Sequence, residues 1–227
     1  VTTGLLTARG PLRVFVSPLA ETSIIGTAIG MAHNGFLPIA EIQFLAYFHN
    51  AEDQLRGEAA TLQFFSQGQF VNPMILRIPG LAYQKGFGGH FHNDNSLAVF
   101  RDIPGIIIAC PSNGADAARM LRSVAREAYE NGRVTVFVEP IALYMTKDLS
   151  EKGDRGWSFT YPDPDEEIEL GEFATYGTGR NLTIVTYGNG AYLCRKAAAE
   201  LEAKHRKKCK VIDLRWLAPL NLSLIHI

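Results

Sequence analysis

Short apolar runs alternate along this chain with segments that have a helical period. Four runs are rich in Ile, Val, Leu and Phe and are as long as strands: LPIAEIQF (37–44), MILRI (74–78), GIIIAC (105–110) and VTVFVE (134–139). Their apolar residues are continuous rather than alternating, which is typical of parallel strands that are covered on both faces. The pattern therefore predicts an α/β fold, a mostly parallel sheet covered by helices.

Three further segments predict helices. Residues 21–34 are apolar or small nearly all the way round, which indicates a buried helix. Residues 50–65 predict a second helix that begins at Asn50, a favourable N-cap residue. The third segment, 111–132, has two distinct faces. Its apolar face contains Ala117, Leu121, Val124 and Ala128, and its basic face contains Arg119, Arg122 and Arg126.

The alternation breaks between residues 146 and 180, which are acidic, rich in turn-forming residues and without a period. We interpret this stretch as a linker with some short strand content. A strand (NLTIVTYG), a helix (AYLCRKAAAELEAKHRKK) and a strand (KVIDLRWL) follow it and predict one βαβ unit. We therefore expect a first domain over 1–145, a linker over 146–180 and the truncated start of a second α/β domain over 181–221.

Both ends of the chain suggest a piece of a longer protein. The chain does not begin with Met, and it ends shortly after the last predicted strand. Residues 222–227, LSLIHI, are what the end sequence of a widely used sequencing transposon encodes in this frame. We interpret these six residues as a library artefact, and an ordinary apolar strand is the alternative.

Composition narrows the class of protein. With 227 residues, 47% of them hydrophobic, the chain can bury a substantial core, and its net charge of −1 offers no basic face for nucleic acid. Three widely spaced cysteines argue against a disulfide framework and for a reducing compartment. The apolar runs are too short to span a membrane, and the start has no signal-peptide pattern. We expect a cytoplasmic globular protein that binds neither nucleic acid nor membrane.

The stretch QKGFGGHFHNDNS, residues 84–96, follows a predicted strand and carries unusual chemistry. His90, His92 and Asp94 have zinc-ligand chemistry in the order H-x-H-x-D, which would suit a zinc-dependent hydrolase. A second possibility is a catalytic histidine, because loops at the carboxyl edge of a parallel sheet bind ligands and glycines permit close approach. The third is a polar surface loop. The residues alone leave all three open.

Glu21 is a second unusual feature, because it begins the apolar segment 21–34. An acidic residue in the first turn complements the helix dipole, which is a sufficient structural explanation. A carboxyl group desolvated by apolar neighbours also holds its proton more readily, and such a group can exchange a proton at neutral pH.

Several motifs together resemble a known family. They are SPLAETSIIGTAIGMAHNGFLPIAEIQFLAYFHNAEDQL, RIPG, GGHFHNDNS, IPGIIIACPSNGADAARMLRS, VFVEPIALY and VIDLRWLAPLN. In this order they resemble the beta subunit of thiamine diphosphate-dependent 2-oxo acid dehydrogenases, within the transketolase-like superfamily. EIQF followed by Tyr47 is most similar to the branched-chain type. The resemblance covers nearly all of the chain outside the linker and residues 222–227.

The resemblance implies a pyrimidine-binding fold and roles for four residues. Glu21 falls where the family keeps the glutamate that hydrogen-bonds the aminopyrimidine of thiamine diphosphate and promotes its activation. Tyr47 and Ile42 fall among the cofactor-binding positions, with the aromatic ring against the pyrimidine. His92 falls on the family's active-site histidine, whereas His90 has no counterpart. The loop has HND where the family usually has HSQ, which leaves the choice of 2-oxo acid open.

The implied reaction is decarboxylation of a 2-oxo acid and transfer of the acyl group to a lipoyl-bearing acyltransferase; another transketolase-like thiamine diphosphate enzyme is the alternative. The family binds the diphosphate and Mg²⁺ through a GDG motif that this sequence lacks. We therefore expect no metal site here, and a partner half that holds Mg²⁺. That half is either an alpha-type subunit or a missing N-terminal half, in an oligomer.

Two other interpretations stay open at this point. TYGNGAYL has a G-x-G turn after a strand, with Asp213 at the end of the next strand, as in dinucleotide sites. The third glycine of that motif is absent, because Leu193 stands in its place. The second open interpretation is a pseudoenzyme that keeps the fold without turnover. The presence of Glu21 and His92 argues against it.

Overall fold

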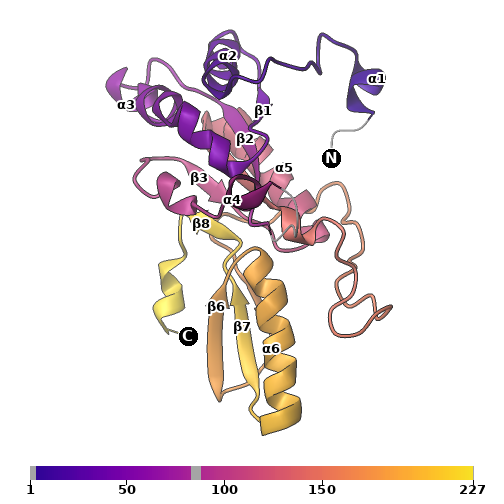
Figure 1. Ribbon diagram of the computed structural model, residues 1–227. Helices are drawn as coiled ribbons and strands as arrows, with labels where there is room; N and C mark the ends of the chain where they lie inside the picture. The colour runs from indigo at the N-terminus through magenta and orange to yellow at the C-terminus, as the bar shows by residue number, and fades with distance from the viewer. Residues whose placement is uncertain (1–3, 83–87, 227) are drawn as a thin grey trace.

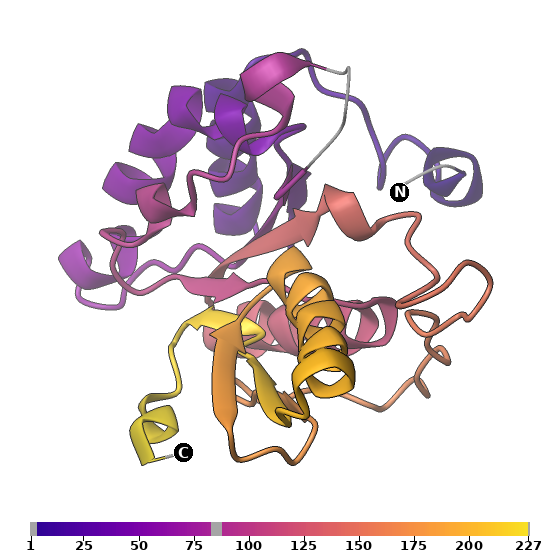
Figure 2. The same cartoon turned by 60° about the horizontal axis from the view of Figure 1, so that its bottom comes forward.

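The structure, a computed structural model, describes residues 4–82 and 88–226. It contains two sheets (Figure 1), one of five strands in the order β1-β2-β4-β3-β8 and one of three in the order β5-β7-β6. Helices lie on both faces of the larger sheet and on one side of the smaller (Figure 2). The predicted α/β fold class is confirmed.

The larger sheet is built on two long central strands. β2 (Met74–Gly80) and β4 (Val134–Pro140) pair in parallel over seven residues, and every residue of both is buried. β1 (Ile39–Glu41) pairs in parallel with β2, and β3 (Ile107–Ala109) with β4. Double coverage of these strands explains their unbroken apolar sequences. The run 37–44 contributes only three strand residues, fewer than its length suggested.

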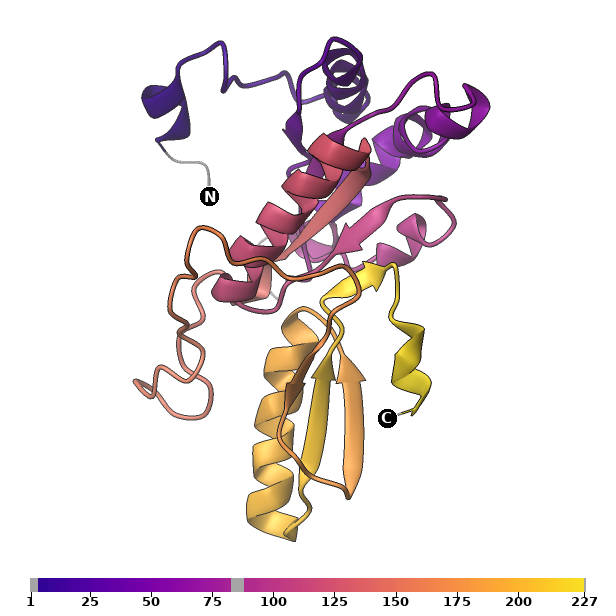
Figure 3. The ribbon, with the colours of Figure 1, turned by 180° about the vertical axis from the view of Figure 1, so that it is seen from behind.

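The two faces of this sheet have separate cores, because neighbouring side chains on a strand point to opposite faces. Leu76 and Ile78 pack with Ile25 of α2 (Glu21–His33) in one core. Ile75 and Phe137 pack in the other beneath α5 (Gly114–Asn131), which crosses the back of the sheet (Figure 3).

The helix α5 follows the predicted two-faced pattern. The side chain of Asn113 caps its N-terminus by accepting a hydrogen bond from the Asp116 N–H at 2.9 Å. Its basic face binds the acidic linker, since Arg119 pairs with Glu166 at 2.6 Å and Arg126 with Glu167 at 2.7 Å. The positive face of α5 thus binds the negatively charged linker through these ion pairs.

Two helix predictions were wrong in part. The helix predicted over 21–34 is buried on one face only: Ile25 and Ala28 are buried, whereas Gly26 is exposed. The segment predicted as a helix from Asn50 begins earlier and is irregular. It comprises the 3₁₀ helix η1 (Leu45–Ala51), the π-helix η2 (Gln54–Ala59) and the short α3 (Leu62–Phe65).

Asn50 lies inside η1 and caps no helix. Its side-chain amide donates to the carboxyl group of Glu21 at 3.5 Å, and its backbone carbonyl accepts from the Thr22 hydroxyl at 2.8 Å. Tertiary contacts with α2 therefore replace the local capping role that Asn50 would otherwise have.

The smaller sheet holds a parallel pair, β6 (Leu182–Thr186) and β7 (Cys209–Asp213), joined by α6 (Asn189–His205). β5 (Ala174–Tyr176) pairs antiparallel with β7. The single strand predicted over KVIDLRWL was wrong. The chain turns after Asp213, and β8 (Trp216–Ala218) crosses to the larger sheet, where it pairs antiparallel with β3.

The remaining described elements are short. They are the helices α1 (Leu5–Arg9) and α4 (Gly89–His92) and the 3₁₀ turns η3 (Leu97–Phe100), η4 (Ile141–Leu143) and η5 (Leu222–His226). None of the helices in the described ranges is both long and apolar enough to cross a bilayer. Leu222 is exposed. The domain boundaries and the artefact at 222–227 remain predictions.

Buried polar contacts join the two sheets. Arg215 binds Asp116 of α5 through two hydrogen bonds, from Nε at 2.9 Å and from Nη2 at 3.0 Å. The Ser112 hydroxyl donates to Asp213, which is fully buried at the end of β7. Trp157 of the linker donates from Nε1 to the Ser112 carbonyl at 3.2 Å. Burial raises the pKa of Asp213 to about 6.

Asp213→Asn tests this junction. The folded-state pKa lies above the unfolded value of about 3.9. Asp213 therefore costs stability progressively as the pH rises from about 4 through 6. Asparagine keeps an oxygen that accepts from Ser112 and carries no charge. We expect the unfolding free energy of D213N, relative to the unsubstituted chain, to rise by roughly 2 kcal/mol between about pH 4.5 and 7.5.

Urea unfolding followed by circular dichroism at the two pH values measures this difference. D165N, which changes an exposed linker carboxylate, is the control. A difference between D213N and the unsubstituted chain that stays constant with pH would contradict the raised pKa of Asp213.

Candidate functional site

Glu21 is the first residue of α2 and is 9% exposed. The residue before it, Ala20, has no side chain that caps the helix. The described partner of the Glu21 carboxyl group is the amide of Asn50, at the long distance of 3.5 Å. The carboxyl group is thus buried yet weakly bonded, which leaves it able to bind a stronger partner.

Tyr47 and Ile42 lie on the same face of the larger sheet as Glu21. Tyr47 belongs to η1, the element that Asn50 ties to α2, and its ring is partly buried. Ile42 follows β1, and its backbone N–H donates to the Arg77 carbonyl at 3.0 Å. The Ile42 side chain has no exposed surface. It supports η1 from beneath, inside the core.

His92 ends the short helix α4 and meets Tyr47, 45 residues earlier in the chain. Its Nε2 is 3.4 Å from the Tyr47 hydroxyl oxygen, and its Nδ1 is 3.1 Å from the Gly88 carbonyl oxygen. The Phe44 ring packs edge-on against the imidazole, with centroids 4.3 Å apart at 87°. The structure therefore brings Tyr47 and His92 together and adds Phe44, which ends the EIQF motif and was missed.

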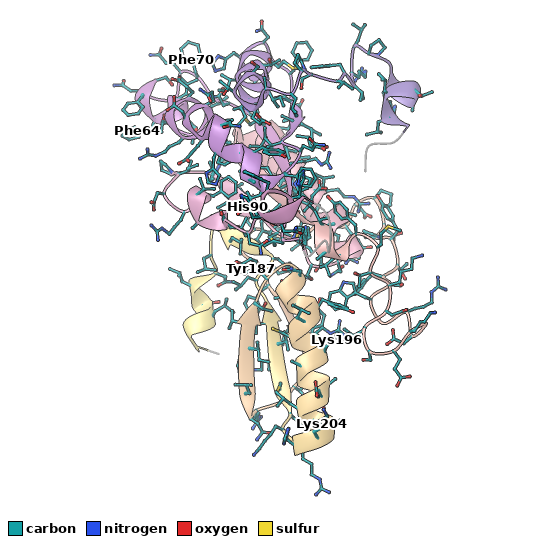
Figure 4. All side chains as sticks on the ribbon, viewed as in Figure 1. Phe64, Phe70, His90, Tyr187, Lys196 and Lys204 are labelled. Carbon is teal, nitrogen blue, oxygen red and sulfur yellow. The ribbon has the colours of Figure 1, made fainter. Side chains whose placement is uncertain are left out.

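His90 and Asp94 do not join this group. His90 is exposed on α4 (Figure 4), and its ring lies against Phe91, with centroids 4.0 Å apart. Asp94 accepts hydrogen bonds from the backbone and hydroxyl of Ser96. Residues two apart on a helix, such as His90 and His92, point in different directions. Gln84, Lys85, Gly86 and Phe87 of this stretch lie outside the described residues.

Within residues 4–82 and 88–226, no three His, Cys, Asp or Glu side chains lie close enough together to hold a metal ion. The arrangement of His90, His92 and Asp94 thus gives the zinc interpretation no support. An extended backbone would place His90 and His92 on one face, whereas here both belong to the helix α4 and point in different directions.

A charged cluster around the buried Arg77, on the opposite face of the sheet, was also missed. Arg77, in the middle of β2, pairs with Glu41 at 2.7 Å and with Glu139 at 2.5 Å, so it links the three strands β1, β2 and β4. The Tyr144 hydroxyl donates to Glu139, and burial together with this bond raises the pKa of Tyr144. A cavity of about 610 Å³ lies beside the cluster, beneath Trp157 of the linker. The sequence signal that could have revealed this cluster was the presence of charged residues within the apolar strand runs.

The G-x-G turn packs against residues that follow strands of the larger sheet. A Cβ on Gly188 would lie 2.8 Å from the Leu81 side chain and 3.0 Å from the Cys110 sulfur, so protein atoms fill the space that a phosphate would need. Asn189, between the glycines, donates to the Leu81 carbonyl at 3.2 Å. Asp213 is fully buried on Ser112 and does not face a ribose site. The dinucleotide interpretation is not supported.

Two family models match this chain. Residues 1–146 match the model of the transketolase pyrimidine-binding domain, and residues 171–226 match that of the transketolase C-terminal domain. The chain belongs to the transketolase pyrimidine-binding family. The resemblance seen in the sequence motifs is confirmed, and so is the fold that it implied.

Curated relatives in this family include beta subunits. The chain is 36% identical to the 2-oxoisovalerate dehydrogenase subunit beta of Pseudomonas aeruginosa, over 99% of this chain and 63% of the relative. It is also 36% identical to the pyruvate dehydrogenase E1 component subunit beta of Bacillus subtilis, over 99% and 64%. The chain thus spans just under two thirds of the length of these relatives.

A solved structure of the same fold is a split gene transketolase, described as an inactive beta4 tetramer. It matches with a TM-score of 0.70 at 20% identity, over 99% of this chain and 64% of that one. At this identity the match supports the transketolase-like α/β fold alone.

Zinc binding gives a direct test of the loop chemistry. We expect the chain, after exposure to excess Zn²⁺ and desalting, to retain well under one equivalent by elemental analysis, because His90 and His92 diverge on α4. H90A and H92A should retain the same amount. One equivalent of zinc that is lost in both variants would contradict the geometry described.

Proposed function

We propose that this chain is the beta-type half of a thiamine diphosphate-dependent 2-oxo acid dehydrogenase and supplies the pyrimidine side of its active site. One observation carries the proposal: the buried Glu21 carboxyl group is tied through Asn50 to the element that holds Tyr47, and Tyr47 contacts His92. The relatives with dehydrogenase names support the substrate class.

The residues present fit the aminopyrimidine of the cofactor. Among the described residues, the Glu21 carboxyl group accepts a long hydrogen bond from Asn50, at 3.5 Å, so it can bond a ring nitrogen more strongly. The half-buried Tyr47 ring offers a flat apolar surface for packing against a heterocycle. Ile42 contributes by packing beneath η1 rather than by an exposed surface.

Bound thiamine diphosphate would supply the carbon nucleophile that adds to the 2-oxo acid and the electron sink for its decarboxylation. Glu21 holds and exchanges a proton at the pyrimidine, a role that suits a carboxyl group shielded from water. His92 directs the 2-oxo acid carboxylate and assists transfer of the acyl group to a lipoyl-bearing acyltransferase, as general acid or base at Nε2.

The other half of the site belongs to a partner. The described residues contain no group of three metal-binding side chains, so the diphosphate and Mg²⁺ need oxygen ligands from elsewhere. We assign them to an alpha-type subunit or to an N-terminal half of the same protein, within an oligomer. All three cysteines are free, which supports a reducing compartment such as the cytoplasm.

Glu21→Gln tests the proposal most directly. Glutamine keeps the shape and can still hydrogen-bond, but it exchanges no proton. In the complete enzyme, we expect E21Q to lower turnover by at least about 10²–10⁴-fold, with the melting temperature unchanged. The assay follows decarboxylation of pyruvate and of branched-chain 2-oxo acids with an artificial electron acceptor.

E58Q, an exposed carboxyl change on the neighbouring η2, is the matched control and should behave as the unsubstituted enzyme does. Full turnover by E21Q, or equal losses in E21Q and E58Q, would remove the assigned role of Glu21.

His92→Ala and His90→Ala separate the two histidines of α4. We expect H92A to lower turnover by roughly 10²-fold or more, because Nε2 faces Tyr47 and the proposed site. H90A removes an exposed ring whose described contact is Phe91, so its turnover should stay near that of the unsubstituted enzyme. A larger loss of turnover in H90A than in H92A would show that His92 is not the catalytic histidine.

A further inference from the structure

Gly88, immediately before α4, accepts a hydrogen bond from His92. Its carbonyl oxygen lies 3.1 Å from Nδ1 of the imidazole, within the same turn. A carbonyl oxygen only accepts hydrogen bonds, so the proton must lie on Nδ1. In the neutral imidazole the lone pair is then on Nε2, which faces the Tyr47 hydroxyl at 3.4 Å.

Gly88 also makes room for the imidazole. A Cβ built on Gly88 would overlap the Nδ1, Cγ and Cβ atoms of His92, all of them closer than real Cβ atoms approach. Rotation of the histidine about χ1 does not move its Cβ, so no other rotamer relieves the overlap. Any side chain at position 88 therefore displaces the backbone of His92 or its own.

A third contact fixes the ring from the other side. Phe44 packs edge-on to the imidazole at 4.3 Å and 87°. The ring is thus held by a carbonyl group at Nδ1, an aromatic wall and a phenol at Nε2. These three supports come from the loop before α4, from the segment after β1 and from η1.

We propose that Gly88 is a positioning residue for His92. Its carbonyl group holds the proton on Nδ1, and its missing side chain leaves the volume that the imidazole occupies, so that the Nε2 lone pair faces Tyr47. The effect of Gly88 on catalysis rests on the proposed function of His92. The tautomer of His92 does not depend on that function. Gly88 then serves the histidine itself rather than a close approach of the ligand.

Gly89 provides a matched control within the same turn. Gly88 has φ = 67° and Gly89 has φ = 52°, so alanine at either position carries the strain of a left-handed backbone. Among the described residues, a Cβ on Gly89 meets no atom within 4 Å, whereas one on Gly88 overlaps His92. G88A and G89A therefore differ mainly in the displacement of the imidazole.

The tautomer is measured by long-range ¹H–¹⁵N NMR of the imidazole in the 227-residue chain, at about pH 8.5, with H92A to assign the signals. We expect a protonated Nδ1 and an unprotonated Nε2 in the unsubstituted chain and in G89A. G88A should lose this signature. Y47F should keep the proton on Nδ1 and shift only the Nε2 signal.

A proton on Nε2 in the unsubstituted chain would overturn the proposal, even if G88A fails to fold. So would an unchanged signature in G88A, or an equal loss in G88A and G89A.

Turnover of the complete enzyme gives the second readout. G88A should lower turnover by on the order of 10²-fold, and the double variant G88A/H92A should be no slower than H92A. Additive losses would show that Gly88 acts independently of His92 and would overturn the proposal. If the NMR signature is found and H92A is fully active, the function proposed for His92 fails while the positioning by Gly88 stands.

Discussion

The parallel pairing of β2 with β4, covered on both faces, is the constraint on which the rest of this structure depends. Seven residue pairs in register make alternate side chains face opposite cores. Leu76 and Ile78 bury α2 and η1 on one side, while Ile75 and Phe137 bury α5 on the other. A shift by one residue would exchange the two cores and would also separate Arg77 from Glu139.

This alternation also separates two sets of polar residues. Glu21, Tyr47 and His92 lie on the α2 face, where the weak hydrogen bond of the carboxyl group and the ordered imidazole favour a site for a ligand. Arg77, Glu41 and Glu139 lie on the α5 face, where short ion pairs connect three strands. This cluster supports the fold, because removing Glu139 would leave the buried charge of Arg77 with one partner fewer.

Buried polar groups join the second sheet to the larger one. Arg215 reaches Asp116, and Ser112 reaches Asp213, while Trp157 covers Ser112 and contacts Tyr192 with ring centroids 5.1 Å apart. Gly188 of the G-x-G turn allows this close approach, because a Cβ there would meet Leu81 and Cys110. Directional bonds of this kind define the orientation of the two sheets more narrowly than apolar packing would.

The sequence by itself determined the α/β class, the doubly covered central strands, the two-faced α5 and the carboxyl group that begins α2. These features depend on local periodicity and burial, which single segments record. The tertiary structure decided that Asn50 binds α2 instead of capping a helix, that KVIDLRWL divides between two sheets, and that His90 and Asp94 stay apart from His92. It also decided that Tyr47 meets His92 and that Gly88 accommodates the imidazole ring. Those outcomes depend on contacts between segments that are distant in sequence or on the exact path of a turn, and neither leaves a periodic trace in the chain.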